Sequence, residues 1–436
     1  MKRILAALLA TVGVAASAPA SPSAPSEQTI TDAYVYLLDR ALVIRQEHTD
    51  LAEKGVTYNT IKYNPLGSAD FVNPNLDVAY LEAWFAVDDK TPVVLDVPEV
   101  KGRYYTAQIM DEWGEVIANI NERTFPTKPF GKFFLVKPGS KVQTPPGAGR
   151  IELHSSKAKM LARVELKGDP EGAVRLQKAF RVTVASQPVI EKPVAISMFD
   201  NKDLIGAEIF ERAGPILASA LDVAPNAAQM QQKVRTVAEH VASGPENRAA
   251  VDRLLREKVI PWFKEFATTK AAPYRNHWLG GGSSGNYGAD YRLRTMCSLI
   301  GIWANTGEEA VYFGAFRDAN EQPLDGGKSY VIHFPADGLP DSVVNAYWSI
   351  ILVGVPDYRV VVNPLKRYNL NNQSPLRKEA DGSLKIAIGP KPVPGVPESN
   401  WLPSAAGKSF SLTFRTYVPK DVVQKGWAPP AVTPVQ

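Results

Sequence analysis

The feature that most constrains the fold of this chain is a repeat, because two β-rich sections carry the same short patterns in the same order. The first section contains LDVP (95–98), YYTAQIM (104–110), and Asn119 followed by Arg123. The second contains IHFP (332–335), AYWSIIL (346–352), and Asn363 followed by Arg367. Short runs rich in β-branched and aromatic residues, bounded by turn residues, are typical of strands in an antiparallel sheet.

The patterns are also similarly spaced. Tyr105 lies 18 residues before Arg123, and Trp348 lies 19 residues before Arg367. Equivalent strand, turn and polar positions at equivalent spacing predict that one β-unit has been duplicated. Chance agreement between short strand patterns is the alternative.

Helical patterns precede and separate the two β sections. Residues 29–48 and three segments between 200 and 269 place apolar residues at helical spacing. We therefore expect an α+β multidomain fold with two similar antiparallel β-sandwich domains, an N-terminal helix and a helical insert. The expected parts are a signal peptide (1–20), an N-terminal linker and helix (21–60), a first sandwich (61–190), a helical region with a glycine-rich loop (191–310) and a second sandwich (311–436).

The first twenty residues have the composition of a secretory signal peptide. Lys2 and Arg3 form a basic start, residues 4–16 are apolar, and cleavage after Ala20 fits the A-x-A pattern. The apolar run is too short to span a membrane, so a membrane anchor is the less favoured alternative. The sequence predicts a periplasmic or secreted protein with no membrane span in the mature chain.

Charge and cysteine content argue against several classes of protein. The formal net charge is +4, and removal of Lys2 and Arg3 leaves +2 without a basic block, so nucleic acid is not an expected partner. Cys297 is the only cysteine, which precludes an intrachain disulfide. One cysteine and five scattered histidines form no zinc-ligand pattern, so no metal site is expected and the cofactor is unknown.

The stretch HWLGGGSSGNYG (277–288) fits two catalytic motifs by its letters alone. As G-x-G-x-x-G it needs a βαβ unit to bind a dinucleotide, and as G-x-S-x-G around Ser283 it needs a strand-to-helix turn that exposes a serine nucleophile. The residues before it look like a helix followed by a loop, which supports neither motif. We expect a loop that lies close to a neighbouring surface or moves as a lid.

Several phrases in the chain resemble one bacterial family. They are NPNLDVAY (73–80), VVLDVPEVKGRYYTAQIMD (93–111), YGADYRLRT (287–295), AYWSIILV (346–353), NPLKRYNL (363–370), NWLP (400–403), FRTYVP (414–419) and GWAPP (426–430). In this order they resemble an exported family with linked domains of unknown function, numbered 1254 at the N-terminus and 1214 at the C-terminus. The resemblance implies a helical part and two similar β-sandwich domains, and it implies no particular reaction.

The family-like phrases contain a set of acidic, basic and aromatic residues. They include Asn75, Asp77, Tyr80, Arg103, Tyr105, Asp111, Arg123, Tyr287, Asp290, Arg294, Trp348, Arg367, Tyr368, Asn400, Trp401 and Arg415. Each has an ordinary structural interpretation, such as a turn, an ion pair or a place in the core. As a set, they could line a cleft between the two sandwiches and the glycine loop.

From this set we predict ten site residues. Asp77 and Asp290 are the candidate acid–base residues, because a carboxyl group with a shifted pKa transfers protons. The candidate substrate-binding residues are Arg103, Tyr105, Arg123, Arg294, Trp348, Arg367, Tyr368 and Trp401, because guanidinium groups bind anions and aromatic faces stack on rings.

The predicted function is that of an exported protein that binds a polar small molecule, anionic or sugar-like, between two β-domains, and hydrolyses or otherwise transforms it. The alternative is a non-catalytic envelope protein that serves assembly or partner binding. Whether the protein is an enzyme, and whether it forms a homo-oligomer, stay open at this point.

Overall fold

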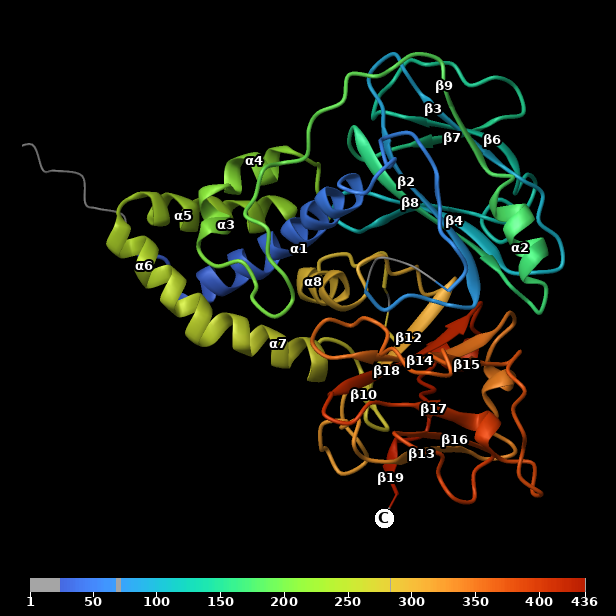
Figure 1. The fold of residues 1–436 in the computed structure, drawn as a ribbon. Helices are drawn as coiled ribbons and strands as arrows, with labels where there is room; N and C mark the ends of the chain where they lie inside the picture. The colour runs from blue at the N-terminus through green and yellow to red at the C-terminus, as the bar shows by residue number, and fades with distance from the viewer. Residues whose placement is uncertain (1–23, 68–71, 283, 436) are drawn as a thin grey trace, which may run out of the picture.

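The computed structural model describes residues 24–67, 72–282 and 284–435, which form two β lobes and a helical lobe (Figure 1). The predicted signal peptide and its cleavage site lie outside the described residues. No helix within these ranges is long and apolar enough to cross a membrane.

The first β lobe contains two sheets, with strand orders β1-β2-β8-β4-β5 and β7-β6-β3-β9. Its elements are β1 (Lys62–Tyr63), β2 (Val78–Ala86), β3 (Val93–Val97), β4 (Tyr105–Met110), β5 (Val116–Ile120), β6 (Gly131–Val136), β7 (Gly149–Glu152), β8 (Lys157–Glu165), α2 (Pro170–Gln177) and β9 (Arg181–Val184). Alternate residues of β2 and β8 face the smaller sheet and form one apolar core with it.

The second β lobe also contains two sheets, with orders β10-β11-β12-β18-β14-β15 and β17-β16-β13-β19. Its elements are β10 (Tyr274–Arg275), β11 (Trp278–Gly280), β12 (Ala310–Ala315), β13 (Tyr330–Phe334), β14 (Trp348–Gly354), β15 (Asn369–Asn371), β16 (Leu384–Gly389), β17 (Trp401–Pro403), β18 (Phe410–Tyr417), α9 (Asp421–Gln424) and β19 (Thr433–Pro434), with short 3-10 turns at Pro340–Val343 and Glu398–Asn400. Its core again lies between the two sheets.

The two lobes have the same topology, which confirms the predicted duplication. Strands β2 to β9 correspond in order to strands β12 to β19, since β2-β8-β4-β5 matches β12-β18-β14-β15 and β7-β6-β3-β9 matches β17-β16-β13-β19. Even the parallel pairing of β6 with β7 recurs between β16 and β17. The β sandwich predicted from sequence therefore occurs twice.

The strand registers show which residues are equivalent. Tyr80 pairs with Arg163 between β2 and β8, and Tyr312 pairs with Arg415 between β12 and β18. On the other side of each arginine, Arg163 pairs with Thr106 and Arg415 pairs with Ser349. Each larger sheet therefore carries a tyrosine and an arginine side by side at the same position.

One part of the predicted alignment is wrong. In the first lobe, the residue three positions after Tyr105 is Gln108, which pairs with Asn119. In the second lobe, the residue three positions after Trp348 is Ile351, which pairs with Asn369 and not with Asn363. Asn363 and Arg367 lie in the loop 355–368 before β15, a longer connection than residues 111–115 in the first lobe. The equivalent of Arg123 is Gln373, because Arg123 lies two residues after Asn121 and Gln373 lies two residues after Asn371.

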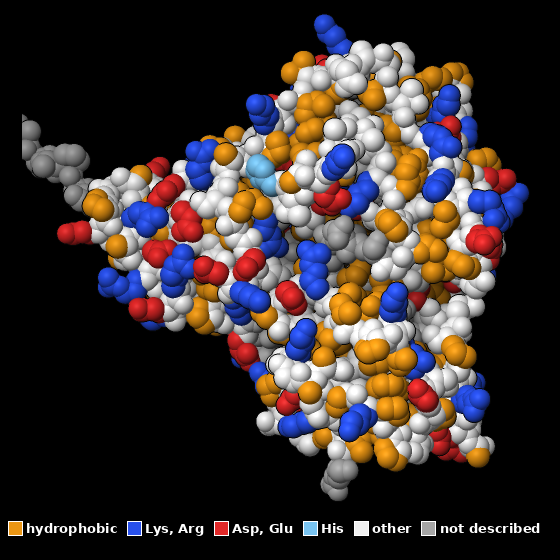
Figure 2. Space-filling view, in the orientation of Figure 1, with side chains coloured by type: hydrophobic (Ala, Val, Ile, Leu, Met, Phe, Trp, Pro, Cys, Tyr) orange, Lys and Arg blue, Asp and Glu red, His pale blue; other side chains and the backbone are white. Residues whose placement is uncertain are grey.

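The helical lobe packs against the first β lobe through the long helix α1, as Figure 1 shows. Its helices are α1 (Glu27–Leu51), α3 (Glu208–Glu211), α4 (Ala213–Ala218), α5 (Ala227–Ala242), α6 (Pro245–Leu254), a π-helical turn at Leu255–Val259, α7 (Ile260–Thr269) and α8 (Tyr291–Ile300). On the face of this lobe that Figure 2 shows, acidic and basic side chains are intermixed.

Helix α1 meets the first lobe through buried ion pairs. Lys159 of β8 lies 2.7 Å from Asp50 of α1, and Arg40 of α1 lies 2.9 Å from Glu112. Burial raises the pKa of Glu112 to about 7, although Arg40 opposes the shift. Burial also raises the pKa of Glu115 to about 7 and that of Asp39 to about 6.

These raised pKa values predict that the protein loses stability as the pH rises from 5 to 7.5. In this interval the folded state holds protons on Glu112 and Glu115 that the unfolded chain has already released, so folding is favoured at the lower pH. The contribution is complete below about pH 4.5, the ordinary pKa of Glu, and is lost as the pH passes about 7. Thermal unfolding at several pH values should give a Tm that falls across this range.

Glu112→Gln should make that decline shallower, because it removes one of the linked protons. Glu99→Gln, at an exposed position, is the matched control and should keep the wild-type slope. A Tm that rises steadily from pH 5 to 7.5 in the wild-type protein would contradict this account of the buried acids.

Candidate functional site

A mostly apolar pocket that contains buried polar groups lies between the larger sheets of the two lobes, beside α8 and the loop after β11. We call it the inter-lobe pocket. Its volume open to the centres of water molecules is about 120 Å³, which is several times the space that one water needs. The described residues that line it are Asn73, Tyr80, Arg163, Ala272, Leu279, Gly280, Gly282, Ser284, Leu293, Met296, Cys297, Ile300, Gly301, Trp303, Ala304, Tyr312, Phe313, Gly314, Phe316, Tyr358, Ser411, Thr413, Arg415 and Tyr417.

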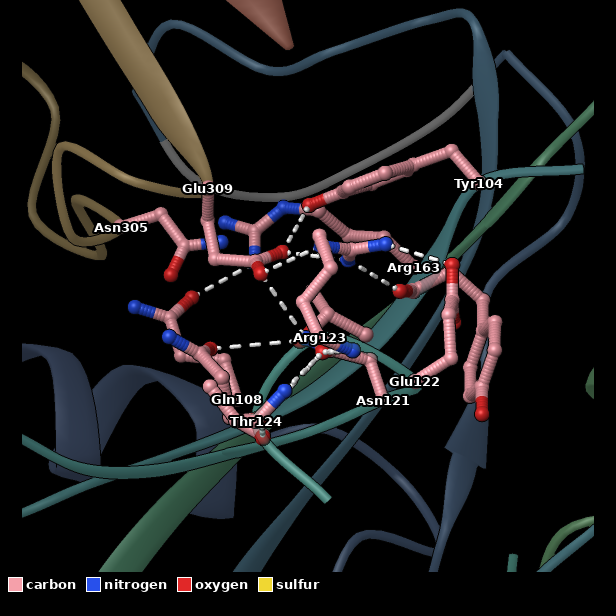
Figure 3. Close-up of polar contacts among 12 residues, drawn as sticks. Tyr104, Gln108, Asn121, Glu122, Arg123, Thr124, Arg163, Asn305 and Glu309 are labelled. Atoms are coloured by element: carbon pink, nitrogen blue, oxygen red, sulfur yellow. Dashed lines mark hydrogen bonds and ion pairs between the residues drawn. The ribbon is translucent and has the colours of Figure 1, made fainter. Parts of the chain in front are cut away.

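Arg163 enters the pocket from β8 of the first lobe and is only 3% exposed. One of its terminal nitrogens donates to the side-chain oxygen of Gln108 at 2.5 Å (Figure 3). The other donates to the backbone oxygen of Trp303 at 3.1 Å. Its Nε is buried and has no hydrogen-bond partner among the described residues. The guanidinium also lies over the ring of Tyr80, 5.6 Å from its centroid.

Arg415 enters the same pocket from β18 of the second lobe and is also 3% exposed. Its Nη2 donates to the backbone oxygen of Asn73 at 2.5 Å and to the side-chain oxygen of Asn73 at 3.0 Å. Its Nη1 is buried and has no hydrogen-bond partner in the described parts of the chain. In the described parts of the chain, neither Arg163 nor Arg415 forms an ion pair with a carboxylate within 4 Å.

The remaining wall of the pocket is mostly apolar and aromatic, with Leu293, Met296 and Phe313 among its members. Among the described lining residues, the two arginines are the only ones with a formal charge at neutral pH. The Cys297 thiol is not a ready nucleophile, because burial raises its pKa to about 12. Burial also raises the pKa of Tyr312, although Arg163 and Arg415 act against the shift.

The glycine stretch forms part of this wall. Gly280 ends β11 with a φ of 147°, and a Cβ there would lie 2.1 Å from the backbone oxygen of Tyr312. All named pairings in the sheet that contains β11 are antiparallel, so no βαβ unit surrounds the loop and the dinucleotide motif does not apply. Ser283 lies outside the described residues. The glycines here allow the loop to lie against β12.

Next to the pocket, an acid from each lobe reaches the other lobe. Glu309, just before β12, accepts hydrogen bonds from Arg123 Nε and Nη2, both at 2.7 Å, and from the Asn121 amide at 3.0 Å (Figure 3). The Tyr104 hydroxyl donates to the same carboxylate at 3.1 Å. This bidentate pair joins the start of the second lobe to the turn that follows β5 of the first.

Asp77, just before β2, makes the equivalent contact in the other direction. Its Oδ1 accepts hydrogen bonds from the amides of Asn369 and Asn371 in β15. Its Oδ2 is buried without a hydrogen-bond partner among the described residues, and so is the nearby hydroxyl of Ser349. Burial raises the pKa of Asp77, against the effects of Ser349, of the two amides and of the charge of Arg415.

None of the ten predicted site residues lines the inter-lobe pocket. Asp77 and Arg123 lie at the contacts between the lobes just described. Asp290 is exposed and caps α8, where it accepts from the Leu293 N–H at 3.0 Å rather than pairing with Arg294. The catalytic roles of Asp77 and Asp290 stay predictions.

The other arginines of the predicted set have intramolecular partners. Arg294 is 1% exposed and pairs with Asp39 at 3.0 Å and Asp222 at 2.9 Å. Arg103 pairs with Asp169 at 2.8 Å. Arg367 donates to the backbone oxygen of Glu398 at 2.7 Å and to that of Trp401 at 3.0 Å.

Each aromatic member of the set makes contacts within its own lobe. Trp348 stacks on Phe414 in the second core, with 5.6 Å between ring centroids. The Tyr105 hydroxyl and the Trp401 Nε1 donate to backbone oxygens of Pro129 and Gly389. Tyr368 is half-buried, and its backbone oxygen accepts from Leu352. These contacts place the four residues in the framework of the lobes.

The residues that sequence analysis missed are Arg163 and Tyr312. Tyr80 and Arg415 belonged to the family-like set but were not chosen. A usable signal was present, because an arginine interrupts an otherwise strand-like run in both MLARVEL and FSLTFRTYV. These two arginines occupy the same position of the repeat.

Two family models match the chain, and together they span more than half of it. One, described as a protein of unknown function (DUF1254), matches residues 57–184, and the other, described as a protein of unknown function (DUF1214), matches residues 309–421. The matches fall on the first and second β lobes respectively, in the predicted order. No curated protein matches the chain.

Two solved structures align with most of the chain. The VPA0106 protein from Vibrio parahaemolyticus aligns over 94% of this chain and 100% of its own, with 20% sequence identity and a TM-score of 0.63. An uncharacterised protein from Burkholderia cenocepacia aligns over 96% of this chain and 91% of its own, with 12% identity and a TM-score of 0.43. The first of these supports the overall fold, and neither assigns an activity.

The position of Gly280 predicts a large difference between two neighbouring alanine variants. Gly280→Ala should lower the Tm, because its Cβ would collide with the backbone of Tyr312 in an unfavourable φ region. We expect a loss above about 1 kcal/mol in unfolding free energy. Gly282→Ala is the control, since its Cβ would approach only Pro273 Cδ, at 3.4 Å. Equal melting of both variants would show that the loop does not pack on β12 as described.

Proposed function

We propose a function for this chain, which belongs to the family in which a DUF1254 domain is followed by a DUF1214 domain. The proposal is that the protein binds a small organic anion in the inter-lobe pocket. The anionic group lies between Arg163 and Arg415, and the apolar body of the ligand lies against the wall formed by α8 and β12. A carboxylate suits these two guanidinium groups, because they present several N–H donors in a planar arrangement.

The observation that carries the proposal is the pair of buried arginines. Each is 3% exposed, each has a buried N–H without a hydrogen-bond partner among the described residues, and both line one cavity. A buried charge without a neutralising partner is costly, and a bound anion removes that cost for both groups together. Guanidinium groups stay charged at physiological pH, so the site is basic under all ordinary conditions.

One acid acts on this site from a greater distance. The charges of Asp77 and Arg415 influence one another, but the two residues form no ion pair within 4 Å. No acid has a comparable influence on Arg163, whose neighbours are tyrosines and amide oxygens. The positive charge of the pocket is therefore only partly balanced by the protein.

Binding is better supported than hydrolysis. General acid–base catalysis uses a histidine or carboxyl group within hydrogen-bond reach of the substrate. Among the described lining residues, no histidine, aspartate or glutamate is present. Hydrolysis or another transformation of the ligand stays a prediction from sequence, and the proposal concerns recognition of the anion.

We also propose that the protein is exported, as the basic and apolar N-terminal segment predicts. The mature chain of the exported protein should begin at Ser21. N-terminal sequencing of the protein recovered from the periplasm or the medium tests this, and a chain recovered intact from Met1 in the cytoplasm would contradict it.

The proposed anion site predicts a charge-dependent affinity. Phenylacetate and octanoate should bind to the purified protein, and their uncharged amides should bind about 10- to 100-fold more weakly, because hydrogen bonds between charged groups contribute about 1.5–3 kcal/mol. Isothermal titration calorimetry measures both members of each pair. Equal affinity for acid and amide would contradict the proposal.

Variants of the two arginines locate the binding. Arg163→Gln and Arg415→Gln should each weaken phenylacetate binding about tenfold or more, since each removes one guanidinium. Arg103→Gln is the matched control, because Arg103 pairs with Asp169 away from the pocket, and it should bind phenylacetate as the wild type does. Thermal unfolding without ligand identifies any variant whose fold is damaged.

A further inference from the structure

A second pocket between the lobes surrounds Asp77. We call it the Asp77 pocket, and its volume open to water centres is about 320 Å³. Asn369, Asn371 and Gln373 line it from β15 and the turn that follows, and Glu165 lines it from the end of β8. It is separate from the inter-lobe pocket, since no described residue lines both.

The duplicated fold supplies an internal comparison for this pocket. Asn121 and Asn371 are equivalent, because they lie opposite Thr106 and Ser349 and make the same turn with the residue two positions later. The backbone N–H of Arg123 donates to Asn121 Oδ1 at 2.8 Å, and the backbone N–H of Gln373 donates to Asn371 Oδ1 at 2.7 Å. Arg123 and Gln373 are therefore equivalent positions.

The acids that these turns face are equivalent as well. Ala310 of β12 corresponds to Val78 of β2, because each lies two residues before the tyrosine that pairs with the equivalent arginine. Glu309 directly precedes Ala310, and Asp77 directly precedes Val78. In one contact the acid is neutralised by the bidentate guanidinium of Arg123. In the other, a neutral glutamine stands in place of the arginine, and a pocket lies beside the acid.

The Asp77 pocket has an excess of unpaired acid. Asp77 and Glu165 are each 5% exposed, and neither has a basic partner within 4 Å among the ion pairs of the described residues. The charges of Arg415 on Asp77, and of Lys167 and Arg103 on Glu165, act from farther away. Lys167 lies at the exposed rim and donates to the backbone oxygen of Gly102. Asp77 Oδ2 makes no hydrogen bond of ordinary geometry in the same part of the structure, and its polar neighbour is the neutral Ser349 hydroxyl, which acts to lower the pKa of Asp77. A buried carboxylate in this state favours a cationic N–H donor.

We propose that the Asp77 pocket binds a small organic cation, whose guanidinium or primary ammonium group takes the place that Arg123 holds at Glu309. The cation donates hydrogen bonds to the free oxygen of Asp77, and Glu165 adds a second negative charge. The neighbouring asparagine amides and the ring of Tyr347 contact the rest of the ligand. This site takes a ligand of opposite charge to the one proposed for the inter-lobe pocket and does not depend on it.

A matched pair of ligands tests the proposal. Butylguanidinium carries the planar cation of arginine, and butylurea has nearly the same shape without the charge. Calorimetric titration of the full chain should show that butylguanidinium binds, and that butylurea binds at least about tenfold more weakly. No binding of butylguanidinium at millimolar concentration, or equal binding of the two compounds, would overturn the proposal.

Two variants identify the site. Asp77→Asn should weaken butylguanidinium binding about tenfold or more, because it removes the charge and keeps the shape. Gln373→Arg should abolish the binding and raise the Tm, because it supplies the side chain that the first lobe has at this position. Gln143→Arg, at an exposed position, is the control and should leave binding and Tm unchanged.

The variant Gln373→Arg also separates the two proposals. It should leave phenylacetate binding unchanged, since Gln373 does not line the inter-lobe pocket. Unchanged butylguanidinium binding in both Asp77→Asn and Gln373→Arg would overturn the assignment to the Asp77 pocket, whatever the outcome for phenylacetate.

Discussion

The packing of the two larger sheets, each buried on both faces, is the constraint on which the rest of the structure depends. All residues of β2 and β8 are buried, although alternate side chains in a strand point to opposite faces. One face of the sheet contacts the smaller sheet of its own lobe. The other contacts α1 and the second lobe. Polar side chains on this second face cannot reach bulk water, so they need partners from other parts of the chain.

Most of these partners are present, and the charged exceptions Arg163, Arg415 and Asp77 lie in the two pockets. Lys159 finds Asp50 of α1, and Glu309 finds Arg123 across the lobe interface. Arg163 and Arg415 keep free N–H groups at a mainly apolar cavity, and Asp77 keeps a free oxygen at a polar one. Because the duplicated lobes meet through equivalent strands, small sequence differences between the repeats decide which of these contacts contain an ion pair and which border a pocket.

The repeat made much of the fold predictable from sequence. LDVP and IHFP fall on β3 and β13, and YYTAQIM and AYWSIIL on β4 and β14, in lobes with the same topology. The equivalence of Arg123 with Arg367 was wrong, because the loop before β15 is longer and its length cannot be inferred from local patterns. The match of Asn-x-x-x-Arg in both sections was a coincidence of composition.

The candidate site was far less predictable. Residues such as Arg294 and Trp348 belong to family-like phrases, but they stabilise the interior through ion pairs and stacking. Arg163 lies in a strand whose alternation of polar and apolar residues is typical of a sheet with one wet face. Only the tertiary structure shows that the polar face is covered by another lobe, which converts an ordinary strand arginine into a buried one.

The proposed anion site requires that the two equivalent arginines converge on one anion. A crystal structure of the protein grown with 4-bromobenzoate tests this most directly, since the bromine gives an anomalous signal that fixes the position of the ligand. The account predicts a bromine peak against the apolar wall of α8 and β12, with the carboxylate between Arg163 and Arg415. A ligand bound only elsewhere, or one whose carboxylate points away from both guanidinium groups, would contradict it.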